Sequence, residues 1–303
     1  MSSAKLSPAI KQLLKLRNPK PLSGPSLSKL LPTFSKTYQD ARQRSAESGW
    51  LVLTTCTLLT ANRPESIGHL YRFVTRSDPS AADSTMLGDS VNKAALMRES
   101  ALKSTIFVGV PRVIISLTAL HEALEDDVKS SLRKESHRTA TPGNVEAILH
   151  RGRGLWDELY DPHSAKLHAK LGSLHPDFIE FIIQAYGSVL APLPPDSTGN
   201  PVQGNLSRAL GSVVGSACLR AEGGVGAQQT SHVFGLLKAR GVLQNQSNED
   251  AWLSSDEGTE WVIRTIDEIL DVVEDGTPSS ADSPTTSQPR ENREVDGRPT
   301  AKL

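Results

Sequence analysis

The amino-acid sequence predicts an all-α fold, and three observations carry that prediction. Apolar residues recur every three or four positions in several long segments, which is the spacing of a helix with one buried face. No segment shows the period-two alternation of a half-buried strand. Aromatic residues make up only 5% of the 303 residues, and the apolar content is mainly leucine and alanine, which favours helices over strands.

The strongest helical signal spans residues 93–124. Gly109 and Pro111 divide this segment, since glycine can end one helix and proline suits the first turn of the next. The segment therefore predicts two antiparallel helices joined by a tight corner. The apolar positions that define their buried faces are Ala95, Leu96, Ala101, Leu102, Ile106, Phe107, Val113, Ile114, Leu117, Leu120 and Leu124.

Further helices are predicted before and after this pair. The apolar spacing places them at about 40–60, 64–76, 145–160, 177–190, 207–220, 228–240 and 259–273. The segment 207–220 is rich in glycine, alanine, serine and valine, so we expect it to pack closely against other helices in the interior. Gly152, inside the 145–160 segment, indicates a close helix approach or a break.

Composition excludes several classes of protein. The formal net charge is −1, so no overall field attracts nucleic acid. No run approaches the roughly 18 apolar residues of a membrane span. The two cysteines, Cys56 and Cys218, do not make a disulfide framework, and two lone cysteines are typical of a reducing compartment and of buried core positions.

The chain divides into three predicted parts. Residues 1–39 contain seven Lys or Arg and no Asp or Glu, so this basic arm is either a mitochondrial targeting segment or an arm that packs on the domain. Residues 40–274 form the all-α domain. Residues 275–303 are rich in Pro, Ser, Thr and Asp, and this composition predicts a disordered tail.

Arg98 and Glu99 lie among the apolar residues of the first helix in the 93–124 segment. Glu99 and Lys103 have the i,i+4 spacing of an ion pair on a helix surface, and a solvated surface pair is the favoured interpretation. The alternative is that Arg98 or Glu99 points into a pocket between helices, where it would contact a ligand.

The pattern R-E-x-A-L followed by G-V-P (residues 98–111) resembles the central helix–corner–helix of the carboxymuconolactone decarboxylase and alkylhydroperoxidase D (AhpD)-like superfamily. A second resemblance is Q-x-x-S-H-x-x-G-L-L-K-A-R-G (228–241), which is similar to the superfamily helix that carries a histidine. The segment 177–187 resembles the preceding helix. Together these resemblances cover about residues 45–245, and they imply an AhpD-like helical bundle and a homo-oligomer.

The resemblance also limits the chemistry. The family's thiol peroxidases carry a Cys-x-x-Cys pair, and Val225 and Gln228 occupy the matching positions here. Neither residue can act as a nucleophile, so a two-cysteine peroxidase cycle at this position is excluded. The resemblance to the decarboxylase members instead implies acid/base chemistry on a small carboxylated or lactone substrate. The residues that it implicates are His232, Arg98, Glu99 and Glu222.

A second interpretation of His232 is a core histidine, in which case the chain is a catalytically silent module for binding or assembly. The sequence carries no cofactor motif. Its other histidines lack the spacing of metal ligands. The expected partners are thus a small-molecule ligand and a further copy of the chain.

Two Cys–His spacings are nearly equal. Cys56 precedes His69 by thirteen residues, and Cys218 precedes His232 by fourteen. Each cysteine lies on one predicted helix and each histidine on the next. The similar spacing indicates either two related helical halves, with repeats at 40–125 and 143–245, or a coincidence.

The chain ends in Ala301, Lys302 and Leu303, a close variant of the Ser-Lys-Leu peroxisomal signal. An exposed C-terminal tail would let an import receptor reach this tripeptide. We therefore expect a peroxisomal location, with mitochondrial import through residues 1–39 or a cytosolic location as alternatives.

Deleting Leu303 tests this expectation. A fluorescent protein fused ahead of the full chain should collect in peroxisomes, and the same fusion without Leu303 should not, because the receptor reads the terminal side chain and carboxylate. Fluorescence microscopy with a peroxisomal marker is the measurement. An unchanged organelle pattern after the deletion would contradict the signal.

Overall fold

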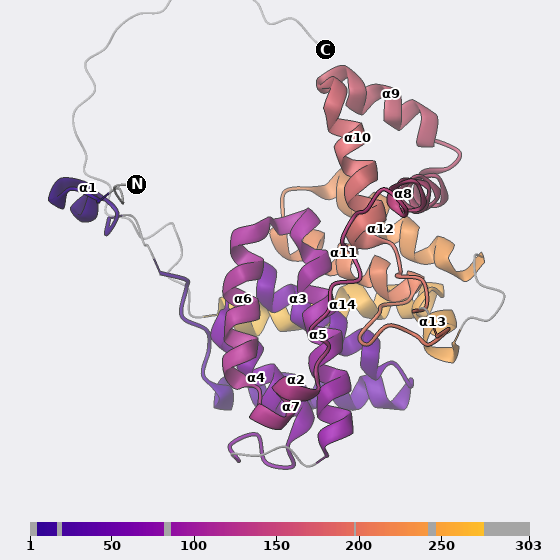
Figure 1. Ribbon diagram of the computed structural model, residues 1–303. Coiled ribbons are helices and arrows are strands. Elements are labelled where there is room, and N and C mark those ends of the chain that lie inside the picture. Colours follow the sequence, from indigo (N-terminus) through magenta and orange to yellow (C-terminus); the bar gives the residue numbers. More distant parts are fainter. Residues whose placement is uncertain (1–4, 17–19, 82–85, 197, 242–246, 276–303) are drawn as a thin grey trace, which may run out of the picture.

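A computed structural model describes residues 5–16, 20–81, 86–196, 198–241 and 247–275. These residues form helices and contain no strand, which confirms the all-α prediction (Figure 1). The elements are α1 (Pro8–Leu13), α2 (Leu27–Gln43), α3 (Glu47–Thr60), α4 (Pro64–Thr75), α5 (Leu87–Val108), α6 (Val110–Ala123), α7 (Asp126–Ser131), α8 (Val145–Tyr160), α9 (Ser164–Leu174), α10 (Pro176–Ala185), η1 (Tyr186–Leu190), α11 (Arg208–Glu222), α12 (Gly226–Lys238), η2 (Ala239–Gly241), α13 (Asn248–Leu253) and α14 (Asp256–Glu274).

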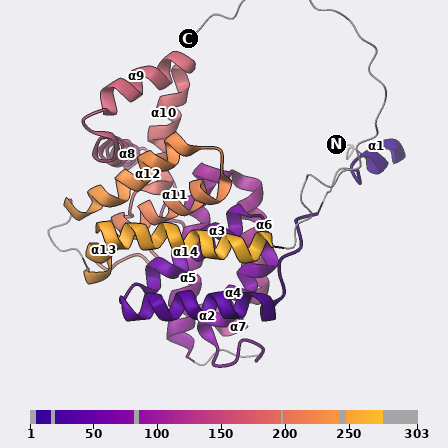
Figure 2. The ribbon, with the colours of Figure 1, turned by 180° about the vertical axis from the view of Figure 1, so that it is seen from behind.

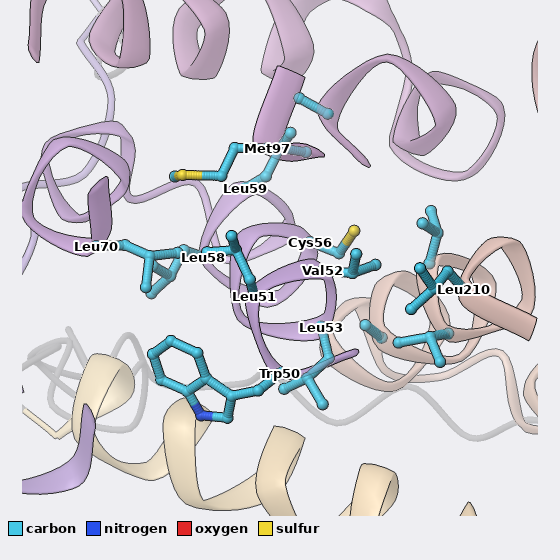
Figure 3. Packing of buried hydrophobic residues seen from close by; sticks show 14 of the residues in the cluster. Trp50, Leu51, Val52, Leu53, Cys56, Leu58, Leu59, Leu70, Met97 and Leu210 are labelled. Atoms are coloured by element: carbon cyan, nitrogen blue, oxygen red, sulfur yellow. The ribbon is translucent and has the colours of Figure 1, made fainter. Parts of the chain in front are cut away.

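The packing of α3 against α11 forms the centre of the molecule. Every residue of α3 from Gly49 to Thr60 is buried, and so is every residue of α11 from Arg208 to Leu219. Side chains project from α3 on all sides into this core (Figure 3). The small residues of α11 allow a close approach, so the segment predicted to lie in the interior does lie there. Helices α5 and α14 pack against both central helices.

An aromatic cluster fixes α2 on this core. The rings of Phe34, Tyr38, Trp50 and Phe73 lie with centroid separations from 4.9 to 6.0 Å. The buried indole N–H of Trp50 donates to Thr37 Oγ1 at 2.9 Å, so its polar atom keeps a partner away from water. Helices α2 and α14 then run side by side across one face (Figure 2).

The prediction of a single helix over about residues 40–60 was wrong. The chain forms two helices there, because Ser45 takes the left-handed conformation (φ 51°) and breaks the hydrogen-bond ladder between α2 and α3. Helix α2 also begins earlier, at Leu27, and accommodates Pro32. The boundary expected at residue 39, between the basic arm and the domain, therefore falls inside a packed helix.

The corner at Gly109 is as predicted. Gly109 has φ 80°, a conformation that favours glycine, and it separates α5 from α6. Pro111 occupies the first turn of α6. This corner turns α6 back along α5 and brings it against α4.

Helices α8, α9, α10 and η1 form a second apolar cluster at one end of the molecule (Figure 1). Gly152 of α8 and Gly187 of η1 face each other there. A Cβ added at Gly152 would lie 2.1 Å from the carbonyl oxygen of Ile183, and one at Gly187 would lie 1.9 Å from that of Ile148. Only glycine lets these two backbones approach so closely, so Gly152 marks a close helix approach and not a break.

Helices α9 and α13 were not predicted. Helix α9 buries only Ser164, so its sequence lacks a strong apolar stripe, and α13 spans six residues, which is short for any periodic signal. Residues 276–303, predicted to be a disordered tail, lie outside the described residues. None of the helices that the structure describes has the length and apolar character needed to cross a membrane.

The Gly152–Gly187 contact predicts a large difference between two neighbouring glycines. Gly152→Ala should lower the free energy of unfolding by about 1–3 kcal/mol, because the new methyl group overlaps a backbone carbonyl. Gly154→Ala, on the same helix with open space around it, should be neutral or stabilising by about 0.5–1 kcal/mol. Urea unfolding of both variants measures the difference. Equal effects would argue against the close approach.

Candidate functional site

Helix α5 carries a buried ion pair. Glu99 and Lys103 are 4% and 0% exposed, and Lys103 Nζ lies 3.6 Å from Glu99 Oε1. The interpretation of this pair as solvated was therefore wrong. The prediction that Glu99 and Lys103 pair with each other was correct. The segment after α7 and the end of η1 cover this face of α5, so the pair is not in contact with water.

Three cations surround the Glu99 carboxylate. Arg138, from the connection between α7 and α8, donates Nη1 to Oε2 at 3.2 Å and Nη2 to Oε1. Arg133 Nη2 lies 3.8 Å from Oε2, and Lys103 Nζ lies 3.6 Å from Oε1. A buried carboxylate needs such partners, since an unpaired charge in the interior costs several kcal/mol. The cluster as a whole keeps an excess of positive charge.

Lys103 joins α5 to the end of η1. Its ammonium group donates to the carbonyl oxygens of Val189, Leu190 and Ala191 at 3.0, 2.7 and 3.1 Å. The last carbonyls of a helix lack partners within the helix and carry its negative end, so a cation there is stabilising. Burial lowers the pKa of Lys103 to about 8 despite the neighbouring Glu99. With three acceptors bound, this amine serves to hold the helices together.

Arg98 lies on a different face of α5 and is half-buried. Burial, and next the charge of Arg133, lower the pKa of its guanidinium. Arg98 and Glu99 share the wall of a small cavity of about 130 Å³. Arg98 also belongs to a larger cavity of about 480 Å³, which we call the α5–α7 pocket. Its lining residues are Arg98, Leu117, Leu120, His121, Leu124, Lys129, Leu132, Arg133 and Lys134.

The α5–α7 pocket combines leucine side chains with positive charge. Its lining contains four Lys or Arg residues and a histidine, and no Asp or Glu. Lys129 pairs with Asp126 at 3.2 Å and Arg133 with Glu99 at 3.8 Å. Within the described residues, no carboxylate forms an ion pair with Arg98 or Lys134. These two cations are therefore available to a negatively charged ligand.

His232 lies outside the α5–α7 pocket, on the face of α12 that is buried in the core. The ring of Phe107 meets its imidazole edge-on with centroids 5.1 Å apart, and a Cβ on Gly215 would come within 2.6 Å of Nδ1. The residue is 6% exposed. Burial, and next the charge of Arg208, lower its pKa to about 4. His232 is thus a neutral core histidine near neutral pH.

The structure does not bring the four predicted residues together. Glu99 and Phe107 are eight residues apart on α5, about 12 Å along its axis, and His232 packs at the Phe107 end. Glu222 ends α11 at the surface, where Arg112 Nη1 donates to its Oε2 at 2.7 Å. Only Arg98 and Glu99 share a cavity. Ala301, Lys302 and Leu303 lie outside the described residues.

Sequence reasoning missed Lys129, Arg133, Lys134 and Arg138 as partners of Arg98 and Glu99. The one available signal was the concentration of basic residues in 129–138. In the sequence alone, such a segment is typical of a linker exposed to solvent. The proximity of the two cysteines was also not predicted from the sequence. Cys56 and Cys218 lie together in the core. Across the described residues, no three His, Cys, Asp or Glu side chains gather as metal ligands.

No family model matches this chain, and neither the curated proteins nor the solved structures contain a match to it.

The burial of His232 predicts a pH dependence of stability. An unfolded chain takes up a proton at this histidine below about pH 6.5, but the folded chain does not until about pH 4. Stability is therefore lost as the pH falls between these values, by up to about 3 kcal/mol at ~1.4 kcal/mol per pKa unit. His232→Gln should remove this part of the loss, as measured by urea unfolding from pH 7 to 4.

The matched control is His150→Gln, because His150 is an exposed residue of the neighbouring α8. This variant should keep the pH profile of the natural chain. A His232→Gln profile that stays parallel to the natural one would show that the imidazole titrates as if in solvent.

Proposed function

We propose that this chain is a divergent AhpD-like helical protein that binds a small carboxylated ligand in the α5–α7 pocket. The observation that carries the proposal is the set of cations on an apolar floor, with no acidic residue in the lining. Arg98 and Lys134 would receive the carboxylate, and the leucines would contact the hydrocarbon part. A volume of about 480 Å³ suits a small organic molecule.

Support for the AhpD-like proposal comes from the helix pairs. The segment that resembles the superfamily's central pair forms α5, the Gly109 corner and α6, and the segment with the histidine forms α12 behind α11. Two related halves are part of the proposal. The hairpins α3–α4 and α11–α12 each carry a cysteine followed by a histidine, and they meet through α3 and α11.

A binding role is favoured over a lyase role by the position of His232. An acid or base must reach the proton that it transfers and must titrate near the working pH. His232 is buried under Phe107, has its pKa lowered to about 4, and lines neither the α5–α7 pocket nor the cavity beside Glu99. Of the two functions considered from the sequence, the catalytically silent binding module is therefore the one we propose.

Titration with octanoate tests the proposal. This probe has a carboxylate and a short apolar chain, so it should bind the natural protein and bind Arg98→Gln about tenfold more weakly, because one charge-assisted hydrogen bond is lost. Isothermal titration calorimetry measures both affinities. A matched cationic probe, octyltrimethylammonium, should not bind at this pocket.

Two variants serve as controls. Arg264→Gln removes an exposed arginine from the groove between α2 and α14, which is lined by both signs of charge, and should leave octanoate binding unchanged. His232→Gln should also leave it unchanged. Equal weakening by Arg98→Gln and Arg264→Gln would indicate nonspecific attraction and contradict the proposed pocket.

A further inference from the structure

Cys56 and Cys218 are 162 positions apart in the sequence and meet at one side chain in the core. Ser104 Oγ of α5 lies 3.4 Å from Cys56 Sγ, and Cys218 Sγ donates to the same oxygen at 3.3 Å. Cys56 belongs to α3 and Cys218 to α11, the two central helices. The two sulfur atoms therefore contact the same serine hydroxyl.

The surroundings of the two thiols differ. Both are free and have no exposed surface. Burial, and next the hydrogen bond with Cys218, raise the pKa of Cys56. Burial also opposes ionisation of Cys218, but its side-chain contacts with Cys56 and Ser104 outweigh burial and lower the pKa of that thiol. Cys218 is accordingly the thiol that ionises first, and Cys56 contacts the same serine hydroxyl.

We propose that Cys56 and Cys218 form a reversible disulfide that cross-links α3 to α11 when the protein meets hydrogen peroxide. The Cys218 thiolate attacks one peroxide oxygen, so an S–O bond forms, the O–O bond breaks and the hydroxide leaving group takes up a proton to become water. Cys56 sulfur then attacks the Cys218 sulfenic acid, forming the S–S bond. The S–O bond breaks, and the departing hydroxide leaves as water with the Cys56 proton.

In balance, two thiols and one peroxide give one disulfide and two waters, with two electrons passing from sulfur to peroxide. A thiol reductant reverses the step by exchange. The site is a pair of cysteines held by a shared serine on a third helix, and it lies apart from the α5–α7 pocket proposed for ligand binding. Peroxide is small enough to enter during local opening of the core.

Cross-linking these two helices has a clear structural consequence. The bond would close a long loop in the unfolded chain, which reduces the freedom of that chain and stabilises the fold. It would join the two helices on which α5 and α14 pack. The oxidised protein should therefore be more resistant to unfolding than the reduced protein, with no change in its helical content.

The test uses the reduced full-length chain, with and without hydrogen peroxide. After peroxide is removed, the chain is unfolded in an alkylating reagent and weighed as an intact molecule. Reduced protein should carry two labels per chain, one for each cysteine in the sequence. Oxidised protein should carry none, should have lost two hydrogen atoms, and should yield a linked peptide pair containing Cys56 and Cys218.

Urea unfolding is the second measurement. The midpoint should rise on oxidation and return on treatment with dithiothreitol, and Cys56→Ser and Cys218→Ser should show no such rise. The single variants replace a thiol by a hydroxyl of similar size, and each keeps one cysteine as an internal control for labelling. Retention of both thiols in the natural chain after peroxide, sulfinic acid without a cross-link, or disulfides only between chains would each overturn the proposal.

Discussion

The burial of α3 and α11 against each other is the constraint on which the rest of the structure depends. A helix that is covered on all sides has no water for its polar side chains, so a hydrogen-bond partner inside the protein stabilises each one that has it. Thr55 and Thr57 of α3 donate to the carbonyl oxygens one turn earlier, each at 2.7 Å. This local bonding lets α3 carry polar residues and still pass through the core, while α2, α5 and α14 cover it.

Features of the fold that depend on local sequence could be predicted. Helix α8 has the predicted bounds, and the Gly109 corner follows from residue types whose conformational preferences act over a few positions. The break at Ser45 could not be predicted in this way. Serine has no preference for positive φ, so the residue type at position 45 does not indicate the break.

In the candidate site, too, contacts between residues close in the sequence could be predicted, and contacts with distant segments could not. The spacing of Glu99 and Lys103 predicts that they interact, but it is identical for a solvated and a buried pair. Their burial depends on Arg138 and on the carbonyls of residues 189–191, which reach α5 only in the folded chain. In the same way, sequence places His232 on a helix, but Phe107 and Gly215 decide that it faces the core.

Helix α5 connects these features because its three faces have different neighbours. Successive residues on a helix are rotated by about 100°, so Arg98, Glu99 and Ser100 point in three directions. Arg98 faces the α5–α7 pocket. The face with Glu99 and Lys103 holds η1, and the face with Ser100 and Ser104 meets the two cysteines.

One rigid helix therefore sets the position of a ligand-accessible cation, of a buried charge cluster and of a thiol pair. The contacts on the three faces differ in how far they allow α5 to move. The leucines of the pocket can adjust around Arg98, but Lys103 contacts three carbonyl oxygens at once and Ser104 contacts two sulfurs at once. A shift of α5 large enough to move Arg98 would lengthen several of these bonds together. The charge cluster and the serine thus hold the helix that presents Arg98 in a fixed position, which lowers the conformational cost of binding at the pocket.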